Sequence, residues 1–145
     1  MAECILQRHG RGRFQSFSAG SQPKGQVNPD AVKLLKKLNY PTENLRSKSW
    51  DEFADSESET MDFVFTVCDN AAGETCPIWP GQPMTAHWGV PDPVTEIGSD
   101  AERGSLFAEI FRMIERRIEI FINLPLASLD KLTLQKRLED IGSAK

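Results

Sequence analysis

The 145-residue sequence has no long apolar run and is poor in cysteine, with three, and in histidine, with two. No apolar stretch approaches the roughly 20 residues that a membrane-spanning helix needs, so the sequence predicts no contact with a membrane. Residues 1–8 have neither the long apolar core nor the small-residue cleavage site of a secretory signal. Three cysteines are too few for a disulfide framework, so a functional cysteine is expected to be catalytic or redox-active. These absences favour a cytoplasmic protein.

Basic residues are missing from one third of the chain. Residues 51–100 hold eleven acidic side chains and no Lys or Arg, whereas residues 1–50 hold nine basic and three acidic side chains. A surface that follows nucleic-acid phosphates needs clustered cations, and only the first third offers them, with few aromatic side chains beside them. The sequence therefore does not favour nucleic-acid binding.

Helix and strand signals alternate over a chain of single-domain length, which predicts one α/β domain over residues 1–145 with a mostly parallel sheet. Asn28 before Pro29 is a helix start, and Ser99 with Glu102 forms a capping box before a long apolar stripe. We expect helices over residues 2–9, from Asn28, from Ser99 and from Ser128, and strands over residues 13–20, 61–68 and 84–90.

The last of these helices follows Pro125. We expect it to begin at Ser128, to place Leu129, Leu132, Leu138 and Ile141 toward the core, and to end at Gly142. This periodicity makes the C-terminal helix part of the hydrophobic core.

Two cysteines follow the best strand signal, where α/β proteins place their ligands. Cys68 and Cys76 are separated by small and polar residues. A loop of this kind could bring two thiols within the about 7 Å between α-carbons that a disulfide requires, as a dithiol relay needs. The alternatives are that both cysteines are structural or incidental, or that Cys68, Cys76 and His87 bind zinc, although this spacing matches no short structural zinc pattern.

Asp92 lies between two prolines, directly after the segment His87-Trp88-Gly89-Val90. Proline fixes the neighbouring backbone and removes an amide donor, so the Asp92 carboxyl group would be held in place and available as a general acid. The alternative is that Asp92 only forms a turn and that His87 and Trp88 only pack together.

Several segments together resemble one enzyme family: Met1-Ala2-Glu3, Ser18-Ala19-Gly20, Asn28-Pro29, Arg46-Ser47-Lys48, Cys68 through Cys76-Pro77, His87-Trp88-Gly89 and Asp92-Pro93. The sequence is similar to the low-molecular-weight protein-tyrosine-phosphatase family, and more closely to its arsenate reductase branch. The resemblance implies a phosphotyrosine protein phosphatase I-like, three-layer α/β sandwich with a four-stranded parallel sheet.

The resemblance also implies a chemistry, the reduction of arsenate to arsenite in arsenic detoxification. In the family a thiolate in a phosphate-binding loop attacks the oxyanion, a second cysteine releases reduced arsenic by forming a disulfide, and a third cysteine takes that disulfide over. Cys68 matches the second cysteine, Cys76 the third, and Asp92 the general acid of the phosphatases. The implied partners are arsenate or phosphate and an external thiol reductant, thioredoxin or the glutathione and glutaredoxin system, with no bound cofactor or metal.

One family feature is missing from the 145 residues. Family members have a nucleophilic cysteine followed six positions later by Arg, but the residues at that distance from Cys4, Cys68 and Cys76 are Gly10, Glu74 and Gln82. Cys4 is no substitute, because it lies within the expected first helix and lacks the backbone amides and Arg of an oxyanion site.

Two expectations follow from the absence of this loop and of the strand that precedes it in the family. Without nucleophile and anion cradle the 145 residues should be inactive alone, and the lost central strand should leave an open gap between the Phe14 and Phe63 strands. A start at an internal Met, with further residues in front of a working protein, explains this most simply. The alternatives are a non-catalytic remnant that acts as a binding or homodimerisation module, and a tyrosine phosphatase when complete.

The family resemblance also bears on potassium binding. Some family members hold this ion through residues that match Glu3 and Ser18 and through an acidic residue where this chain has Lys48. An ammonium group would fill the role of the ion, so we expect no potassium dependence.

Overall fold

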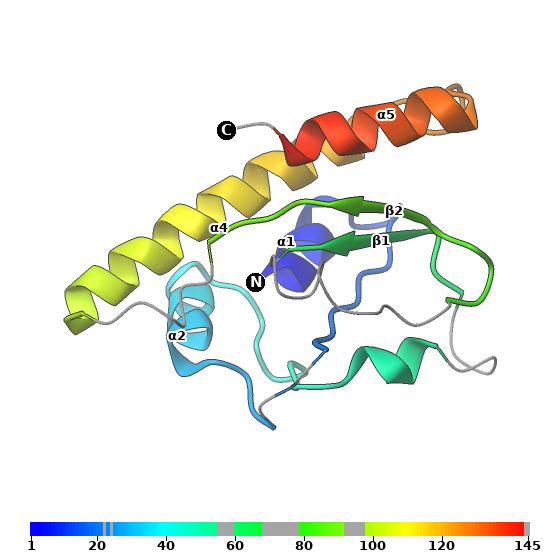
Figure 1. The fold of residues 1–145 in the computed structure, drawn as a ribbon. Helices are drawn as coiled ribbons and strands as arrows, with labels where there is room; N and C mark the ends of the chain where they lie inside the picture. Colours follow the sequence, from blue (N-terminus) through cyan, green and yellow to red (C-terminus); the bar gives the residue numbers. More distant parts are fainter. Residues whose placement is uncertain (22, 24, 55–59, 68–78, 92–97, 144–145) are drawn as a thin grey trace.

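The computed structural model describes residues 1–21, 23, 25–54, 60–67, 79–91 and 98–143. Their elements follow in the order α1 (Ala2–His9), α2 (Pro29–Lys37), the short 3-10 helix η1 (Trp50–Phe53), β1 (Phe63–Thr66), β2 (Met84–His87), α4 (Asp100–Ile122) and α5 (Lys131–Gly142) (Figure 1). The α/β fold class predicted from the sequence is confirmed, and the described sheet is small and parallel. Among the helices of these ranges, none combines the length and apolarity of a membrane span.

Two helix starts are set by the predicted caps. The Asn28 side-chain oxygen accepts hydrogen bonds from the backbone N–H groups of Asp30, at 2.8 Å, and Ala31, at 3.3 Å. The Ser99 hydroxyl oxygen accepts one from the N–H of Glu102 at 3.2 Å. Each cap satisfies amides that have no partner within the helix, so α2 and α4 begin where their sequences require.

The sheet of the described residues has two strands, β1 and β2, which run parallel with Phe63 opposite Met84 and Thr66 opposite His87. The strand expected over residues 13–20 is not confirmed. Only Gly20 pairs, in an isolated bridge with Ser49. A strand exists through its neighbour's hydrogen bonds, and along residues 14–19 the structure describes no neighbouring strand.

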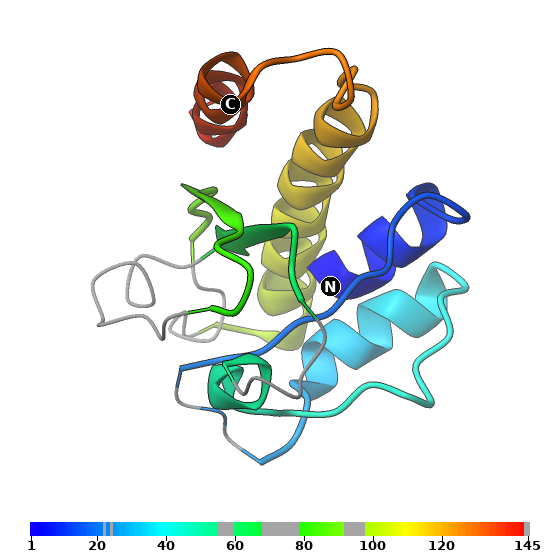
Figure 2. The ribbon, with the colours of Figure 1, turned by 90° about the vertical axis from the view of Figure 1, so that its right-hand side faces the viewer.

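The core lies where α4 crosses the sheet, around the side chain of Phe121. The Phe121 ring lies 5.1–5.8 Å, between centroids, from the rings of Phe14, Phe63, Phe65 and Trp88. These separations are typical of aromatic pairs that contribute beyond their buried area. Figure 2 shows α1 beside α4 on one side of the two strands. Phe121 therefore packs α4 against β1 and against Trp88, which directly follows β2.

The start expected for the last helix is wrong. Helix α5 begins at Lys131, and its N-cap is Asp130, whose carboxylate accepts a hydrogen bond from the Thr133 N–H at 2.8 Å. Ser128 instead belongs to a turn, since its N–H donates to the Pro125 carbonyl at 2.9 Å.

One residue of α5 that faces the core differs from the residues expected from the sequence. Leu132 is 86% exposed, whereas Leu134, Leu138 and Ile141 are buried. Gly142 is the last residue of the helix and lies against the His87 carbonyl, where a side chain would clash. Leu129, Leu138 and Ile141 therefore lie toward the core as expected, and Leu134 takes the place that was expected for Leu132.

Two leucines of α5 test this assignment. We expect Leu138→Ala, at a side chain that is 0% exposed, to lower the free energy of unfolding by about 2–5 kcal/mol, because it leaves a cavity. The matched change Leu132→Ala should alter it by no more than about 0.5 kcal/mol. Urea unfolding followed by far-UV circular dichroism measures both, and equal losses would contradict the assigned helix face.

Candidate functional site

The three predicted site residues, Cys68, Cys76 and Asp92, lie outside the described residues. What the structure describes is the framework on both sides of them: β1 with Val67, which directly precedes Cys68, and β2 with the segment that ends at Pro91. The geometry of this framework shows which parts of the chain meet at the predicted site.

Parallel pairing continues past the carboxyl ends of both strands. The Trp88 N–H donates to the Thr66 carbonyl at 2.7 Å, and the Val90 N–H donates to the Val67 carbonyl at 2.9 Å. The segment before Cys68 and the segment before Asp92 are thus hydrogen-bonded to each other. They meet at the carboxyl edge of the sheet, where α/β proteins bind their ligands.

A buried arginine from α4 fixes the second of these segments. Arg117 is only 6% exposed, and its Nη1 donates to the carbonyl oxygens of Trp88, at 2.7 Å, and Gly89, at 2.8 Å. Burial lowers its pKa from the usual range, but a guanidinium remains charged in proteins, and two carbonyl acceptors compensate part of its desolvation. Arg117 therefore positions the backbone that leads to Asp92.

Arg117 was not among the residues predicted from the sequence. A signal was present, because this charge interrupts an apolar stripe between the buried residues Ile114 and Ile118. Arg116 beside it is exposed, so the sequence alone did not show which arginine turns inward.

His87 and Trp88 have different roles. The Nδ1 atom of His87 lies 2.7 Å from the Thr66 hydroxyl oxygen across the strand pair. Trp88 is buried, donates its indole N–H to the Leu138 carbonyl at 2.8 Å and stacks on Phe65 with 3.7 Å between ring centroids. Trp88 is therefore a packing residue that ties β2 to α5.

The zinc alternative involves two residues outside the described part of the chain, Cys68 and Cys76. Within the described ranges no group of three His, Cys, Asp or Glu side chains could hold a metal ion.

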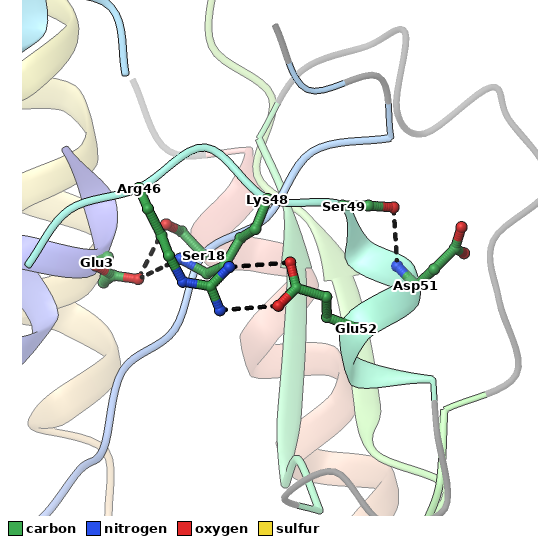
Figure 3. A network of polar contacts seen from close by, with 7 residues as sticks. All are labelled: Glu3, Ser18, Arg46, Lys48, Ser49, Asp51 and Glu52. Atoms are coloured by element: carbon green, nitrogen blue, oxygen red, sulfur yellow. Dashed lines mark hydrogen bonds and ion pairs between the residues drawn. The ribbon is translucent and has the colours of Figure 1, made fainter. Parts of the chain in front are cut away.

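A second polar cluster joins α1 to distant segments (Figure 3). The Glu3 carboxylate oxygen Oε1 accepts a hydrogen bond from the Ser18 hydroxyl at 3.1 Å and lies 3.4 Å from the Lys48 ammonium. The side chains of Lys48 and Glu3 are only 7% and 19% exposed. An ammonium group thus lies next to the Glu3 carboxylate that Ser18 also contacts, as the family resemblance implies.

The backbone reinforces this connection. The Gly20 N–H donates to the Lys48 carbonyl and the Trp50 N–H donates to the Gly20 carbonyl, both at 3.0 Å. Beyond them Arg46 holds the Glu52 carboxylate with two hydrogen bonds of 2.8 and 3.1 Å, which keep the pKa of Glu52 below its usual range (Figure 3). Residues 18–20 and 46–52 therefore form one unit with the first turn of α1.

A cavity of about 1870 Å³ separates this unit from the sheet. Residues 13–21 and 61–67 both line this cavity, together with Leu6 of α1 and Ile118 of α4. The gap expected between the Phe14 and Phe63 segments corresponds to this cavity.

Cys4, the one cysteine among the described residues, lies on the buried face of α1 and is 9% exposed. Burial raises the pKa of its thiol. A reactive cysteine needs a lowered pKa and access to its target, so Cys4 has the properties of a structural residue.

Comparison with known proteins is consistent with this framework. Residues 1–136 match the family described as low molecular weight phosphotyrosine protein phosphatase. The chain is 31% identical to an arsenate reductase of Halalkalibacterium halodurans over 121 residues, which cover 83% of this chain and 84% of that protein. It is 30% identical to an arsenate reductase of Bacillus subtilis over 122 residues, with the same two shares.

A solved structure supports the fold. The structure titled "An arsenate reductase in reduced state" superimposes with a TM-score of 0.58 at 20% sequence identity, covering 83% of this chain and 84% of that one. The match over residues 1–136 and the two relatives agree with one another, and the chain belongs to the low molecular weight phosphotyrosine protein phosphatase family.

Proposed function

We propose that the protein takes part in the reduction of arsenate to arsenite, with Cys68 and Cys76 as the dithiol relay and Asp92 as an accessory acid. The observation that carries the proposal is the 31% identity, over 83% of the chain, to a protein named arsenate reductase. The hydrogen-bonded ends of β1 and β2 support it, because the chain reaches Cys68 and Asp92 from adjacent strands.

In the proposed reaction a thiolate first binds arsenate with loss of hydroxide, which forms a sulfur–arsenic bond. The Cys68 sulfur then attacks that thiolate's sulfur, the sulfur–arsenic bond breaks, and its electron pair leaves with arsenic as arsenite. Cys76 next attacks Cys68 and frees the first sulfur. An external dithiol, thioredoxin or the glutathione and glutaredoxin system, reduces the resulting Cys68–Cys76 disulfide.

The first thiolate is the step that the 145 residues do not supply. None of their three cysteines precedes an Arg by six positions, and buried Cys4 lies inside α1. A site without nucleophile and without fixed anion donors loses both covalent attack and transition-state stabilisation. We therefore propose that these residues alone do not reduce arsenate.

An arsenate-reduction assay tests this function. The 145-residue chain and a form extended upstream in the same reading frame are each assayed with thioredoxin and with glutathione and glutaredoxin. We expect arsenite only from the extended form, and we expect Cys68→Ser and Cys76→Ser each to abolish its multiple turnover while Cys4→Ser retains it.

Two results would overturn the proposal. Activity of the short chain would mean that the phosphate-binding loop is dispensable, and inactivity of both forms would mean that the chain is not a reductase. The extended form could instead release phosphate from a tyrosine phosphate ester and fail to reduce arsenate. This result would favour the tyrosine-phosphatase hypothesis.

Because the Lys48 ammonium lies beside Glu3, we predict that potassium does not change the stability of the fold. We expect equal melting temperatures in potassium and sodium chloride at the same ionic strength, and a higher temperature in potassium would contradict the prediction.

Lys48→Met should lower the free energy of unfolding by about 1–3 kcal/mol, because it leaves the largely buried Glu3 carboxylate without its cation. The exposed residue Lys36 provides the matched control, since Lys36→Met should change little.

The buried Cys4 thiol predicts a loss of stability at alkaline pH. Because burial raises its pKa, the folded chain keeps the thiol proton to a higher pH than the unfolded chain, where the thiol ionises near 9.0. This contribution is fully present below that pH and is lost as the pH rises through the folded pKa. Urea unfolding between about pH 7 and 10 should give a flatter profile for Cys4→Ala than for the unchanged chain, and parallel profiles would rule this contribution out.

A further inference from the structure

A surface hollow lies where α1, α2 and α4 meet. Its volume is about 360 Å³, and its lining comes from α1, from α2 with the turn after it, and from α4. Both α1 and α2 pack against α4 (Figure 2). The residues that α4 contributes follow the i, i+3, i+4, i+7 spacing of a single helix face: Ala108, Phe111, Arg112 and Glu115.

This hollow is separate from the cavity beside β1. That cavity borders a different face of α4, which includes Ile114 and Ile118. Within the described ranges the two spaces have no lining residue in common. A ligand in the hollow would therefore contact neither β1 nor the segments that lead to the predicted site.

Apolar side chains supply most of the lining. Leu34 of α2 and Leu38 directly after it line the hollow together with Phe111 of α4. Tyr40 adds its ring, which lies 5.8 Å from that of Phe111 between centroids. Leu38 keeps 37% of its surface exposed, so an apolar group bound here would remove it from water. Pockets for small organic ligands begin at about 300 Å³, which matches the size of this hollow.

The first of the charged side chains in the lining, Arg8, is engaged within the chain. Its guanidinium donates to the carbonyl oxygens of Leu38, at 3.3 Å, and Asn39, at 2.5 Å, which directly follow α2. It also lies 3.4 Å from the centroid of the Tyr40 ring. These contacts satisfy carbonyl groups at the end of α2, where the helix dipole would otherwise repel an anion.

The other two charged side chains in the lining, Glu115 and Arg112, differ in their partners. The Glu115 carboxylate lies 3.5 Å from the Nε2 atom of His9. Arg112 is exposed, and among the described residues its guanidinium has no hydrogen-bond or ion-pair partner. Burial raises the pKa of Tyr40, so its phenol adds no charge near neutral pH. With two guanidinium groups and one carboxylate in its lining, the hollow favours an anion.

We propose that this hollow binds a small apolar carboxylate, whose charged group pairs with Arg112 and whose apolar body packs against Leu38 and Phe111. A guanidinium offers two parallel N–H donors, which match the two oxygens of a carboxylate. An inorganic oxyanion would leave the apolar lining exposed to water, so the apolar body distinguishes this ligand from arsenate and phosphate. The proposal goes beyond arsenate reduction and does not depend on it.

The chain has a single tyrosine, Tyr40, which makes the hollow directly observable. With isotope-labelled tyrosine rings, NMR of the full 145-residue chain shows the ring signals of this residue alone. Naphthoate is the probe, and naphthamide, which has nearly the same shape and no charge, is its control. Inorganic phosphate is a second control, because it carries charge without an apolar body.

Two variants test the ion pair. Arg112→Gln removes the proposed partner of the carboxylate, and Arg137→Gln, at an exposed arginine of α5, removes the same charge elsewhere. We expect naphthoate to shift the Tyr40 signals with a Kd of about 1 mM, as its size allows. Arg112→Gln and the exchange of naphthoate for naphthamide should each weaken binding at least about fivefold. Arg137→Gln should leave the Kd unchanged, and phosphate should not shift the signals.

Any of three results would overturn the proposal. Tyr40 signals that do not move up to the solubility limit of naphthoate would show that the hollow does not bind it. Equal affinities for naphthoate and naphthamide would show apolar adsorption without recognition of the carboxylate. Equal losses of affinity in Arg112→Gln and Arg137→Gln would show a general attraction by the charge of the chain.

Discussion

The parallel pairing of β1 and β2 is the constraint on which the rest of the structure depends. Four residues on each strand form it, and two hydrogen bonds beyond their ends, from Trp88 to Thr66 and from Val90 to Val67, extend it toward the predicted site. So short a pair is not stable by itself in water and needs packing on another layer. Here Phe121 of α4 contacts rings of both strand segments, and Arg117, one helical turn earlier, holds the backbone after β2. One face of α4 thus stabilises the sheet and positions the chain before Asp92.

The surroundings of β1 differ between its two edges. On one edge β2 and α5 complete a packed unit, in which Trp88 stacks on Phe65 and donates to Leu138. On the other edge lies the cavity, whose far wall is tied to α1 through Glu3, Ser18 and Lys48. Because those polar contacts and the α1–α4 packing hold both walls, the cavity is part of the fold and not a separation of two domains. The same feature explains why residues 14–19 form no strand although their alternation favours one.

Local signals in the sequence were sufficient for some elements and insufficient for others. The caps at Asn28 and Ser99 were predictable because one side chain satisfies amides two or three residues away. The start of α5 was not, since Ser128 and Asp130 are both good caps and the turn after Pro125 decides between them. Arg117 could not be singled out because its inward orientation depends on carbonyl groups 28 and 29 residues away. The placement of Cys68, Cys76 and Asp92 stays a prediction, carried by the family resemblance.

The proposed function requires that Cys68 and Cys76 form a redox pair from which Cys4 is excluded. Mass-spectrometric peptide mapping after mild oxidation of the fully reduced chain tests it most directly, because each cysteine is identified separately. We predict one intramolecular disulfide, between Cys68 and Cys76, with Cys4 recovered as a free thiol and full reversal by a dithiol. A disulfide that contains Cys4, or two thiols at Cys68 and Cys76 that stay unbridged while the chain is folded, would contradict it.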